Sequence, residues 1–252
     1  MGWSFYSDLK VISAQEKWDR LKLLIGAEAL YNISQKRVIL FGVGGVGSWC
    51  AEALIRSAVQ HLELVDFDSV APSNINRQLM ATSLTIGTPK VDALKERLLT
   101  INPDATIIAH NKYYSQKEKW GLKGYDLVID CIDTLPGKVG IAIEAAEAET
   151  ALISSMGAGR KFDPTQIRVG SIWKTKGCPL ARELRLRLRQ AHFSEDFLAV
   201  YSEEPPMGDE RLSQESHCTE SSKRSFGSAV HMTASFGMVL AGKALEQLSL
   251  PH

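Results

Sequence analysis

A glycine-rich turn is the first feature of this 252-residue sequence that could take part in chemistry. Gly42, Gly44 and Gly47 are spaced as G-x-G-x-x-G, and Gly45 lies between them. Glycines at this spacing allow a phosphate to approach the backbone, and the N–H groups of a following helix favour its negative charge. The motif predicts a nucleotide site, while an ordinary strand–helix turn is the alternative.

Side chains of the types that bind phosphate follow this turn. Four of them lie close together in the chain: Asn74, Asn76, Arg77 and Gln78. Their amide and guanidinium donors suit phosphate oxygens and a purine ring. Lys90 follows Pro89 and is expected in the first turn of a helix, where the helix dipole repels a cation. A bound anion would reverse that penalty, so we interpret Lys90 as an anion ligand, with a solvated lysine as the alternative.

Two acidic residues end apolar stretches that are expected to reach one edge of a sheet. Asp66 comes about twenty residues after the glycines, where a Rossmann-type arrangement places a ribose-binding carboxylate. Asp133 closes a second apolar stretch, and ligands gather beyond the carboxyl ends of parallel strands. Two carboxylates beside a triphosphate indicate Mg²⁺. A helix-capping role for Asp133 is the alternative and is compatible with metal binding.

The elements that must position these residues alternate between strands and helices. Apolar runs predict buried parallel strands at 38–41, 61–67, 106–109, 126–132 and 151–155. Helical spacing predicts helices at 14–34 (one or two), 46–58, 89–101, 136–149, 180–192 and 230–248. Residues 166–172 alternate as a strand that pairs antiparallel. We therefore predict an α/β fold: a Rossmann-like, mostly parallel sheet with helices on both faces and an antiparallel extension in the C-terminal third.

The composition is typical of one globular domain, here spanning residues 1–252. With 29 acidic and 29 basic residues, the chain has no net charge and no global field that attracts nucleic acid or a membrane. Its four cysteines form no C-x-x-C pair, which argues against a zinc ribbon and a disulfide framework and favours the cytoplasm. Residues 203–225 show no hydrophobic period, which predicts a mobile loop over the site.

The most basic stretch lies in the helix expected at 180–192. Arg182, Arg185 and Arg189 share one stripe of that helix. Lys174 and Lys176 precede it. A solvated charged face and a contact surface for a nucleic-acid phosphate backbone are both compatible with this pattern.

Five motifs together resemble the ubiquitin-activating-like adenylating superfamily. In chain order they are residues 42–47, 66–68, 73–78, 87–90 and 130–133. Three further segments resemble its branch of tRNA threonylcarbamoyladenosine dehydratases: residues 163–167, 178–182 and 200–205. The sulfur-carrier branches usually carry two C-x-x-C zinc pairs, which this sequence lacks, and this supports the tRNA branch.

The resemblance implies that the clustered polar residues bind ATP. The glycine turn would cradle the phosphates, Asp66 would hold the ribose hydroxyls, and Asp68 belongs to the same nucleotide-binding set. Asn74 would contact phosphate. The implied catalytic residues are Arg77, Lys90 and Asp133. The two cations would neutralise the departing pyrophosphate, and Asp133 would hold Mg²⁺.

The implied reaction is ATP-dependent adenylation of the threonylcarbamoyladenosine carboxylate in tRNA, followed by cyclising dehydration. The resemblance further implies that this modified adenosine lies beside the anticodon. The chain would be a single ATP-binding adenylating domain that forms a homodimer, with tRNA and a sulfur-transfer or other accessory protein as partners and no membrane partner. Arg20 matches an arginine that reaches the phosphates, from the same chain or from the other subunit. Residues 221–227 lack a cysteine that some members carry, so a thioester is not expected there.

Three alternatives share part of this pattern. An adenylating enzyme for another carboxylate, such as the C-terminus of a small carrier protein, would use the same residues. A nicotinamide-dependent oxidoreductase would share the glycines and Asp66 but would leave Arg77, Lys90 and Asp133 unexplained. A non-catalytic scaffold would not need intact phosphate-neutralising residues.

Overall fold

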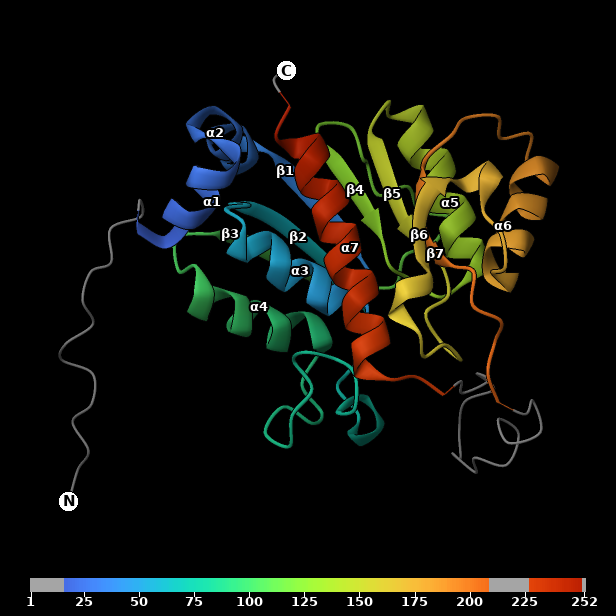
Figure 1. Ribbon diagram of the computed structural model, residues 1–252, viewed down its shortest axis with the longest axis horizontal. Helices are drawn as coiled ribbons and strands as arrows, with labels where there is room; N and C mark the ends of the chain where they lie inside the picture. Colours follow the sequence, from blue (N-terminus) through green and yellow to red (C-terminus); the bar gives the residue numbers. More distant parts are fainter. Residues whose placement is uncertain (1–15, 209–226, 251–252) are drawn as a thin grey trace.

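A seven-stranded sheet forms the centre of the protein. The computed structural model describes residues 16–208 and 227–250. Within these residues the strands lie in the order β3-β2-β1-β4-β5-β7-β6 (Figure 1). Their bounds are β1 Arg37–Phe41, β2 His61–Asp66, β3 Thr106–Asn111, β4 Leu127–Asp130, β5 Ala151–Ser155, β6 Ile167–Ser171 and β7 Leu198–Ser202. These strands pair in parallel except for β6 and β7, which are antiparallel, so the predicted sheet is confirmed.

Helices cover both faces of this sheet (Figure 1). One face carries α2 Ala27–Gln35, α3 Gly47–Arg56, α4 Lys90–Ile101 and α7 Val230–Leu248, and the other carries α5 Leu135–Glu147 and α6 Pro179–Gln190. The remaining elements are α1 Asp19–Ile25 and the 3₁₀ turns η1 Glu16–Trp18, η2 Pro72–Asn74, η3 Pro164–Gln166 and η4 Ile172–Lys174. A hydrophobic core lies on each face of the sheet. Side chains alternate between the two faces along β1, so Val38 and Leu40 belong to one core and Ile39 and Phe41 belong to the other.

Strand β7 is an element that the sequence analysis did not predict. It lies inside the sheet, between β5 and β6, and Ala199 and Val200 are fully buried. Its five residues are too few and too apolar to show a strand period. Its partners come from distant parts of the chain, so only the tertiary structure identifies it as a strand.

The stretch predicted to be a mobile loop, 203–225, begins directly after β7. Its second residue, Glu204, is buried, and its carboxylate accepts the backbone N–H groups of Phe162 at 2.9 Å and Asp163 at 3.0 Å. These bonds fix the start of the stretch against the segment that follows β5. Residues 209–226, which hold most of the predicted loop, lie outside the described residues.

The C-terminal helix α7 crosses α3 with the two backbones almost in contact. A Cβ built on Gly237 would lie 2.6 Å from the carbonyl oxygen of Val46 and 2.9 Å from the backbone nitrogen of Cys50. Gly237 therefore sets how closely α7 approaches the helix that follows the glycine turn. In the part of the chain that the structure describes, no helix has the length and apolar character needed to cross a membrane.

We expect Gly237→Ala to destabilise the protein by about 1–3 kcal/mol, because the added methyl group forces α7 away from α3. The free energy of unfolding in urea measures this effect. Gly242→Ala is the matched control on the same helix, since a Cβ there meets no described atom within 4 Å. The control should gain about 0.5–1 kcal/mol from helix propensity. Equal effects of the two substitutions would contradict the proposed close contact.

Candidate functional site

The turn between β1 and α3 has no room for side chains at two of its glycines. Gly42 adopts a φ of +86°, and a Cβ there would lie 2.8 Å from the carbonyl carbon of Cys131. A Cβ on Gly47 would lie 1.9 Å from the carbonyl oxygen of Gly42. Both positions therefore require glycine. They allow the turn after β1 to touch the turn after β4, as expected for a single crevice.

Gly44 is the open position of the same turn. The nearest atom to a Cβ built there is Nε2 of Gln78, at 3.9 Å. Gly45 is more confined, with Thr233 at 3.3 Å and Cγ of Arg77 at 3.4 Å from the equivalent position. The space over Gly44 can therefore receive a ligand at the N-terminus of α3, where free N–H groups favour a phosphate.

Asp66 is held by the backbone around the glycine turn. Its Oδ2 accepts the N–H of Val43 at 2.9 Å, and its Oδ1 accepts the N–H of Asp68 at 2.9 Å. Burial raises the pKa of Asp66, and the nearby positive charge of Lys90 opposes that rise. The oriented carboxylate is suited to accept hydrogen bonds from ribose hydroxyls.

Lys90 is buried and paired with an acidic residue. Its Nζ lies 2.8 Å from Oδ2 of Asp68, and its side chain is 7% exposed. The backbone N–H of Lys90 donates to the carbonyl oxygen of Asp68 at 2.9 Å and closes the base of the long 67–89 connection. Lys90 is the first residue of α4, with Pro89 as the N-cap. The alternative of a solvated lysine is therefore wrong, and a phosphate would meet an ammonium group that is already positioned.

Arg77 lies beside Gly45 with one part of its guanidinium fixed. Nη1 donates to the carbonyl oxygen of Ser73 at 2.8 Å and to Oδ1 of Asn76 at 2.9 Å. Burial lowers the pKa of Arg77, although an arginine remains charged at neutral pH. Because a guanidinium carries several N–H donors, Arg77 retains the capacity to bind a phosphate.

Asn74 and Gln78 are buried next to Arg77. Oδ1 of Asn74 accepts the N–H of Ala71 at 3.0 Å, so the amide stabilises η2 in addition to its predicted phosphate contact. The sequence analysis counted Gln78 among the donors without assigning it to the site. Its Oε1 is buried and has no hydrogen-bond partner among the described residues. A buried polar atom without a hydrogen bond destabilises the folded state by roughly 1–3 kcal/mol. A bound ligand or water that donates a hydrogen bond to this oxygen would remove that cost.

Asp133 lies just after the turn segment that touches Gly42. It is exposed, and Thr134 rather than Asp133 is the N-cap of α5, without a side-chain capping bond. The alternative capping role is therefore not observed. The described residues contain no cluster of three His, Cys, Asp or Glu side chains suited to a metal. Mg²⁺ commonly binds one or two carboxylates together with substrate phosphates, and an exposed Asp133 fits that arrangement.

A buried lysine that the sequence analysis missed fixes the end of β4. Lys138 on α5 is 1% exposed, and its Nζ donates to Oδ2 of Asp130 at 2.9 Å. It also donates to the carbonyl oxygen of Ser155 at 2.7 Å and to Oγ of Ser154 at 3.2 Å. These hydrogen bonds join β4, β5 and α5 next to the turn that leads to Asp133. The feature of the sequence that could have revealed them is a lysine within a mostly apolar helix.

Arg20 lies far from the glycine turn of its own chain. The residue belongs to α1, and the neighbouring Lys17 binds Asp104 at 2.9 Å, just before β3 begins. This contact places α1 at the amino-terminal edge of the sheet, whereas Asp66 lies at the carboxyl-terminal edge (Figure 1). The structure does not bring Arg20 to the nucleotide site within one chain.

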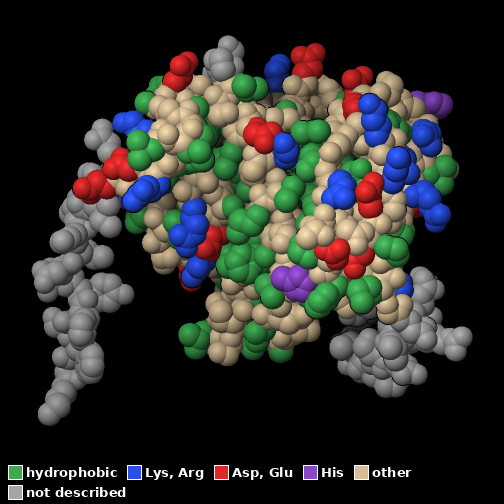
Figure 2. Space-filling view, in the orientation of Figure 1, with side chains coloured by type: hydrophobic (Ala, Val, Ile, Leu, Met, Phe, Trp, Pro, Cys, Tyr) green, Lys and Arg blue, Asp and Glu red, His purple; other side chains and the backbone are tan. Residues whose placement is uncertain are grey.

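Lys and Arg side chains gather at the end of the protein where α6 lies (Figure 2), and the basic residues of α6 itself are all arginines. Arg185 is partly committed to the fold, because its Nη1 donates to the carbonyl oxygen of Thr175 at 3.0 Å. The guanidinium of Arg189 lies 5.5 Å from the ring centre of Trp173, and Arg182 is exposed. Of the predicted stripe, Arg182 and Arg189 remain at the surface.

Comparison with known proteins gives concordant matches in sequence and in structure. The sequence profile of the ThiF family matches residues 18–245. The tRNA threonylcarbamoyladenosine dehydratase of Bacillus subtilis is 40% identical over 76% of each chain, and that of Haemophilus influenzae is 32% identical over 95% of each chain. The Escherichia coli tRNA N6-threonylcarbamoyladenosine dehydratase in complex with AMP superimposes with a TM-score of 0.84 at 30% identity, covering 96% of this chain and 98% of that chain. Its complex with ATP gives a TM-score of 0.83.

We expect Gly44→Ala to weaken ATP binding by about 10- to 100-fold, the scale of a steric conflict of about 1–3 kcal/mol, without lowering the melting temperature. The reason is that the methyl group fits the free protein but enters the space over the turn. Gly47→Ala is the contrasting variant and should lower the melting temperature itself. Calorimetric titration with ATP and thermal unfolding measure the two effects. If Gly44→Ala binds ATP with wild-type affinity, the phosphates do not lie over Gly44.

Proposed function

The chain belongs to the ThiF family, and we propose that it is an ATP-dependent tRNA threonylcarbamoyladenosine dehydratase. The observation that carries the proposal is the match, over nearly the whole chain, to the E. coli dehydratase, whose structures hold AMP and ATP. The site is consistent with it. The open backbone at Gly44, the oriented carboxylate of Asp66 and the buried ammonium of Lys90 are groups suited to bind the phosphates and ribose of a nucleotide.

In the first proposed step the enzyme activates a carboxylate. The ATP phosphates lie over Gly44, and the ribose hydroxyls donate to Asp66. A carboxylate oxygen of the threonylcarbamoyladenosine attacks the α-phosphorus, and the bond to the bridging oxygen of pyrophosphate breaks. Arg77 and Lys90 stabilise the charge that develops on pyrophosphate, because the protein holds both cations in position before the reaction.

The second proposed step closes a ring on the tRNA. A nucleophilic atom of the same modified group attacks the activated carbonyl carbon, and the bond to the AMP oxygen breaks. AMP thereby carries away one of the original carboxylate oxygens, and the displaced proton passes to solvent. The modified nucleoside loses the elements of one water molecule overall.

Three features of the chain prepare the site for the phosphate charge. Asp68 holds the ammonium of Lys90 at the base of the connection, so little conformational entropy is lost when a phosphate binds. Asp133 would hold Mg²⁺, which supplies further neutralisation of the phosphates when it is bound. The Lys138 network fixes the strand end from which the Asp133 turn emerges.

We further propose a homodimer in which Arg20 acts on the nucleotide of the other subunit. Arg20 does not reach the site of its own chain. Leu23 and Leu24 on the same helix are 82% and 81% exposed, and adjacent apolar side chains of this kind favour a contact surface. A two-fold axis would let α1 of each subunit approach the site of its partner.

The proposed substrate is a tRNA, which favours a cytoplasmic location. Arg182 and Arg189 on α6 are available for its phosphates, whereas Arg185 is partly bound to Thr175. The accessory sulfur-transfer protein stays a prediction from the sequence. A carrier-protein substrate is less well supported, since the zinc-binding cysteine pairs of the sulfur-carrier branches are absent from the sequence.

Incubation of the protein with ATP and threonylcarbamoyladenosine-containing tRNA should release AMP and yield a nucleoside lighter by one water. Mass analysis of digested tRNA and an AMP assay measure the two products. Arg77→Ala and Lys90→Ala should each lower AMP formation by roughly two to three orders of magnitude, because each removes a group that stabilises developing charge. Lys95→Ala, on the same helix as Lys90, should leave the rate unchanged. A tRNA of unchanged mass in the presence of the wild-type protein would refute the proposed function.

A mixture of two inactive variants tests the role of Arg20. Arg20→Ala and Lys90→Ala should each be inactive alone. After subunit exchange, heterodimers contain one site with both lesions and one intact site, so the mixture should recover about a quarter of the wild-type rate. The rate of AMP formation measures the recovery. No recovery, with heterodimers demonstrated by tagged subunits, would exclude action of Arg20 across the interface.

A further inference from the structure

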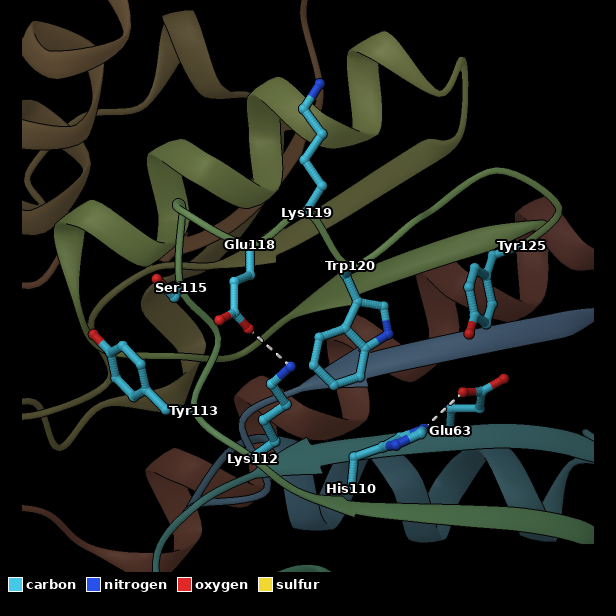
Figure 3. A pocket seen from close by; sticks show the side chains of 9 residues that line it. All are labelled: Glu63, His110, Lys112, Tyr113, Ser115, Glu118, Lys119, Trp120 and Tyr125. Atoms are coloured by element: carbon cyan, nitrogen blue, oxygen red, sulfur yellow. Dashed lines mark hydrogen bonds and ion pairs between the residues drawn. The ribbon is translucent and has the colours of Figure 1, made fainter.

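A cavity lies beside the edge strand β3, outside the glycine turn. Its volume is about 380 Å³, within the range of small-ligand sites. In Figure 3, Trp120 stands at its centre, between Lys112 and Tyr125, with His110 and Glu63 at its base. The segment between β3 and β4 forms most of its walls. The reaction steps derived above do not use this cavity.

The segment that forms the cavity alternates basic and aromatic residues. Its lysines are Lys112, Lys117, Lys119 and Lys123. Its aromatic residues are Tyr113, Tyr114, Trp120 and Tyr125. Glu118 is the only acidic residue between positions 112 and 125, so the stretch is clearly basic in a chain without net charge. Interleaved aromatic rings and cations are the groups that bind single-stranded nucleic acid, because bases stack on the rings and phosphates pair with the cations.

The orientation of the Trp120 ring is fixed by contacts with neighbouring aromatic rings. Its ring centre lies 5.4 Å from that of Phe41 and 5.1 Å from that of His110, both in edge contacts. The polar groups at the base are already paired, since Nε2 of His110 lies 2.8 Å from Oε2 of Glu63. Burial and Glu63 raise the pKa of Tyr125 to about 12, so its hydroxyl stays neutral. The cavity therefore offers a fixed indole, with Nζ of Lys112 over the ring at 5.9 Å from its centre. A flat, uncharged base that stacks on this ring takes the place of the ammonium, which then pairs with a flanking phosphate. The other polar groups are neutral or internally paired.

Two lysines at the rim form ion pairs in which a phosphate could replace the carboxylate. Lys112 lies 3.0 Å from Glu118, and Lys119 lies 2.5 Å from Glu147. All four side chains are more than half exposed. Exposed ion pairs of this kind contribute little to stability, so a nucleic-acid phosphate can displace the carboxylates at small cost.

The cavity adjoins the nucleotide site through a pair of aromatic rings. Tyr113 at its rim packs edge-on against Phe67, with ring centres 4.9 Å apart. Phe67 directly follows Asp66, the ribose-binding carboxylate. A strand of RNA whose modified adenosine lies beside the ATP bound in the nucleotide site can therefore place a nearby base in the cavity.

We propose that this cavity binds an unpaired base of the tRNA anticodon loop, stacked on Trp120, with Lys112 and Lys119 contacting its flanking phosphates. This inference rests on the proposed function. It assigns to the β3–β4 segment the recognition of RNA next to the residue that reacts. It separates that role from the α6 surface, which lies beyond α5 and contacts phosphates alone.

Anticodon stem-loop RNAs that carry threonylcarbamoyladenosine test the proposal. Each unpaired base in turn is replaced by an abasic site, and fluorescence anisotropy measures the dissociation constant. With the wild-type protein, one abasic position should lower affinity by about 5- to 100-fold, the scale of one base–aromatic stack. Trp120→Ala should lower affinity for the intact RNA by the same factor and should no longer respond to that abasic position. Trp120→Phe should restore part of the response, and ATP affinity should stay unchanged in both variants.

The lysines provide a second measurement that does not depend on the indole. Lys112→Ala and Lys119→Ala together should reduce the salt dependence of RNA binding by about two phosphate contacts. Lys243→Ala is the matched control, because this lysine also forms an exposed pair, with Glu246 at 2.7 Å, on the opposite face of the sheet. If Trp120→Ala does not fold, the lysine pair decides the question.

The outcomes separate this inference from the proposed function. A folded Trp120→Ala protein with wild-type affinity for every RNA, or a lysine pair with an unchanged salt slope, would overturn the cavity assignment even if the wild-type protein converts the tRNA. A wild-type protein that leaves the tRNA unchanged would overturn the proposed function instead.

Discussion

The turn after β1 lies so close to the backbone of the turn after β4 that it cannot carry a side chain at Gly42, and the proposed nucleotide site depends on this approach. A Cβ on Gly42 would meet the backbone of Cys131, and a Cβ on Gly47 would meet Gly42 itself. The contact holds the ends of β1 and β4 together. The hydrogen bonds of Lys138 fix the end of β4, and the carboxylate of Asp66, at the end of β2, accepts a hydrogen bond from the glycine turn. Nucleotide binding then requires little movement of the backbone, which lowers its entropic cost.

Features that depend on local sequence were predictable, and features that depend on distant segments were not. The glycine turn, Asp66 and α4 follow from spacing and from strand ends, and the structure places them as expected. Strand β7 has no period of its own and is defined only by β5 and β6. Likewise, the pairing of Lys90 with Asp68 and the burial of Lys138 arise when separate elements pack together. The sequence shows which residues are charged, but only the folded structure shows which of them form ion pairs.

The electrostatic arrangement explains how a buried ammonium is tolerated at the proposed phosphate site. An isolated buried ammonium would be costly, and Asp68 offsets that cost for Lys90. Asp66 lies close enough for its pKa to respond to the same ammonium. A phosphate bound as proposed would share this ammonium with Asp68.

The packing of α7 on α3 has a consequence for how the chain folds during synthesis. Helix α3 emerges from the ribosome well before Gly237 and the rest of its covering helix, because the segments from β2 to β7 are made between them. At typical rates of translation, the apolar face of α3 stays uncovered for on the order of ten seconds or longer. A nascent chain in this state exposes a hydrophobic surface to the cell. Chaperone binding to the incomplete chain, and aggregation of truncated products, follow from the late arrival of this one helix.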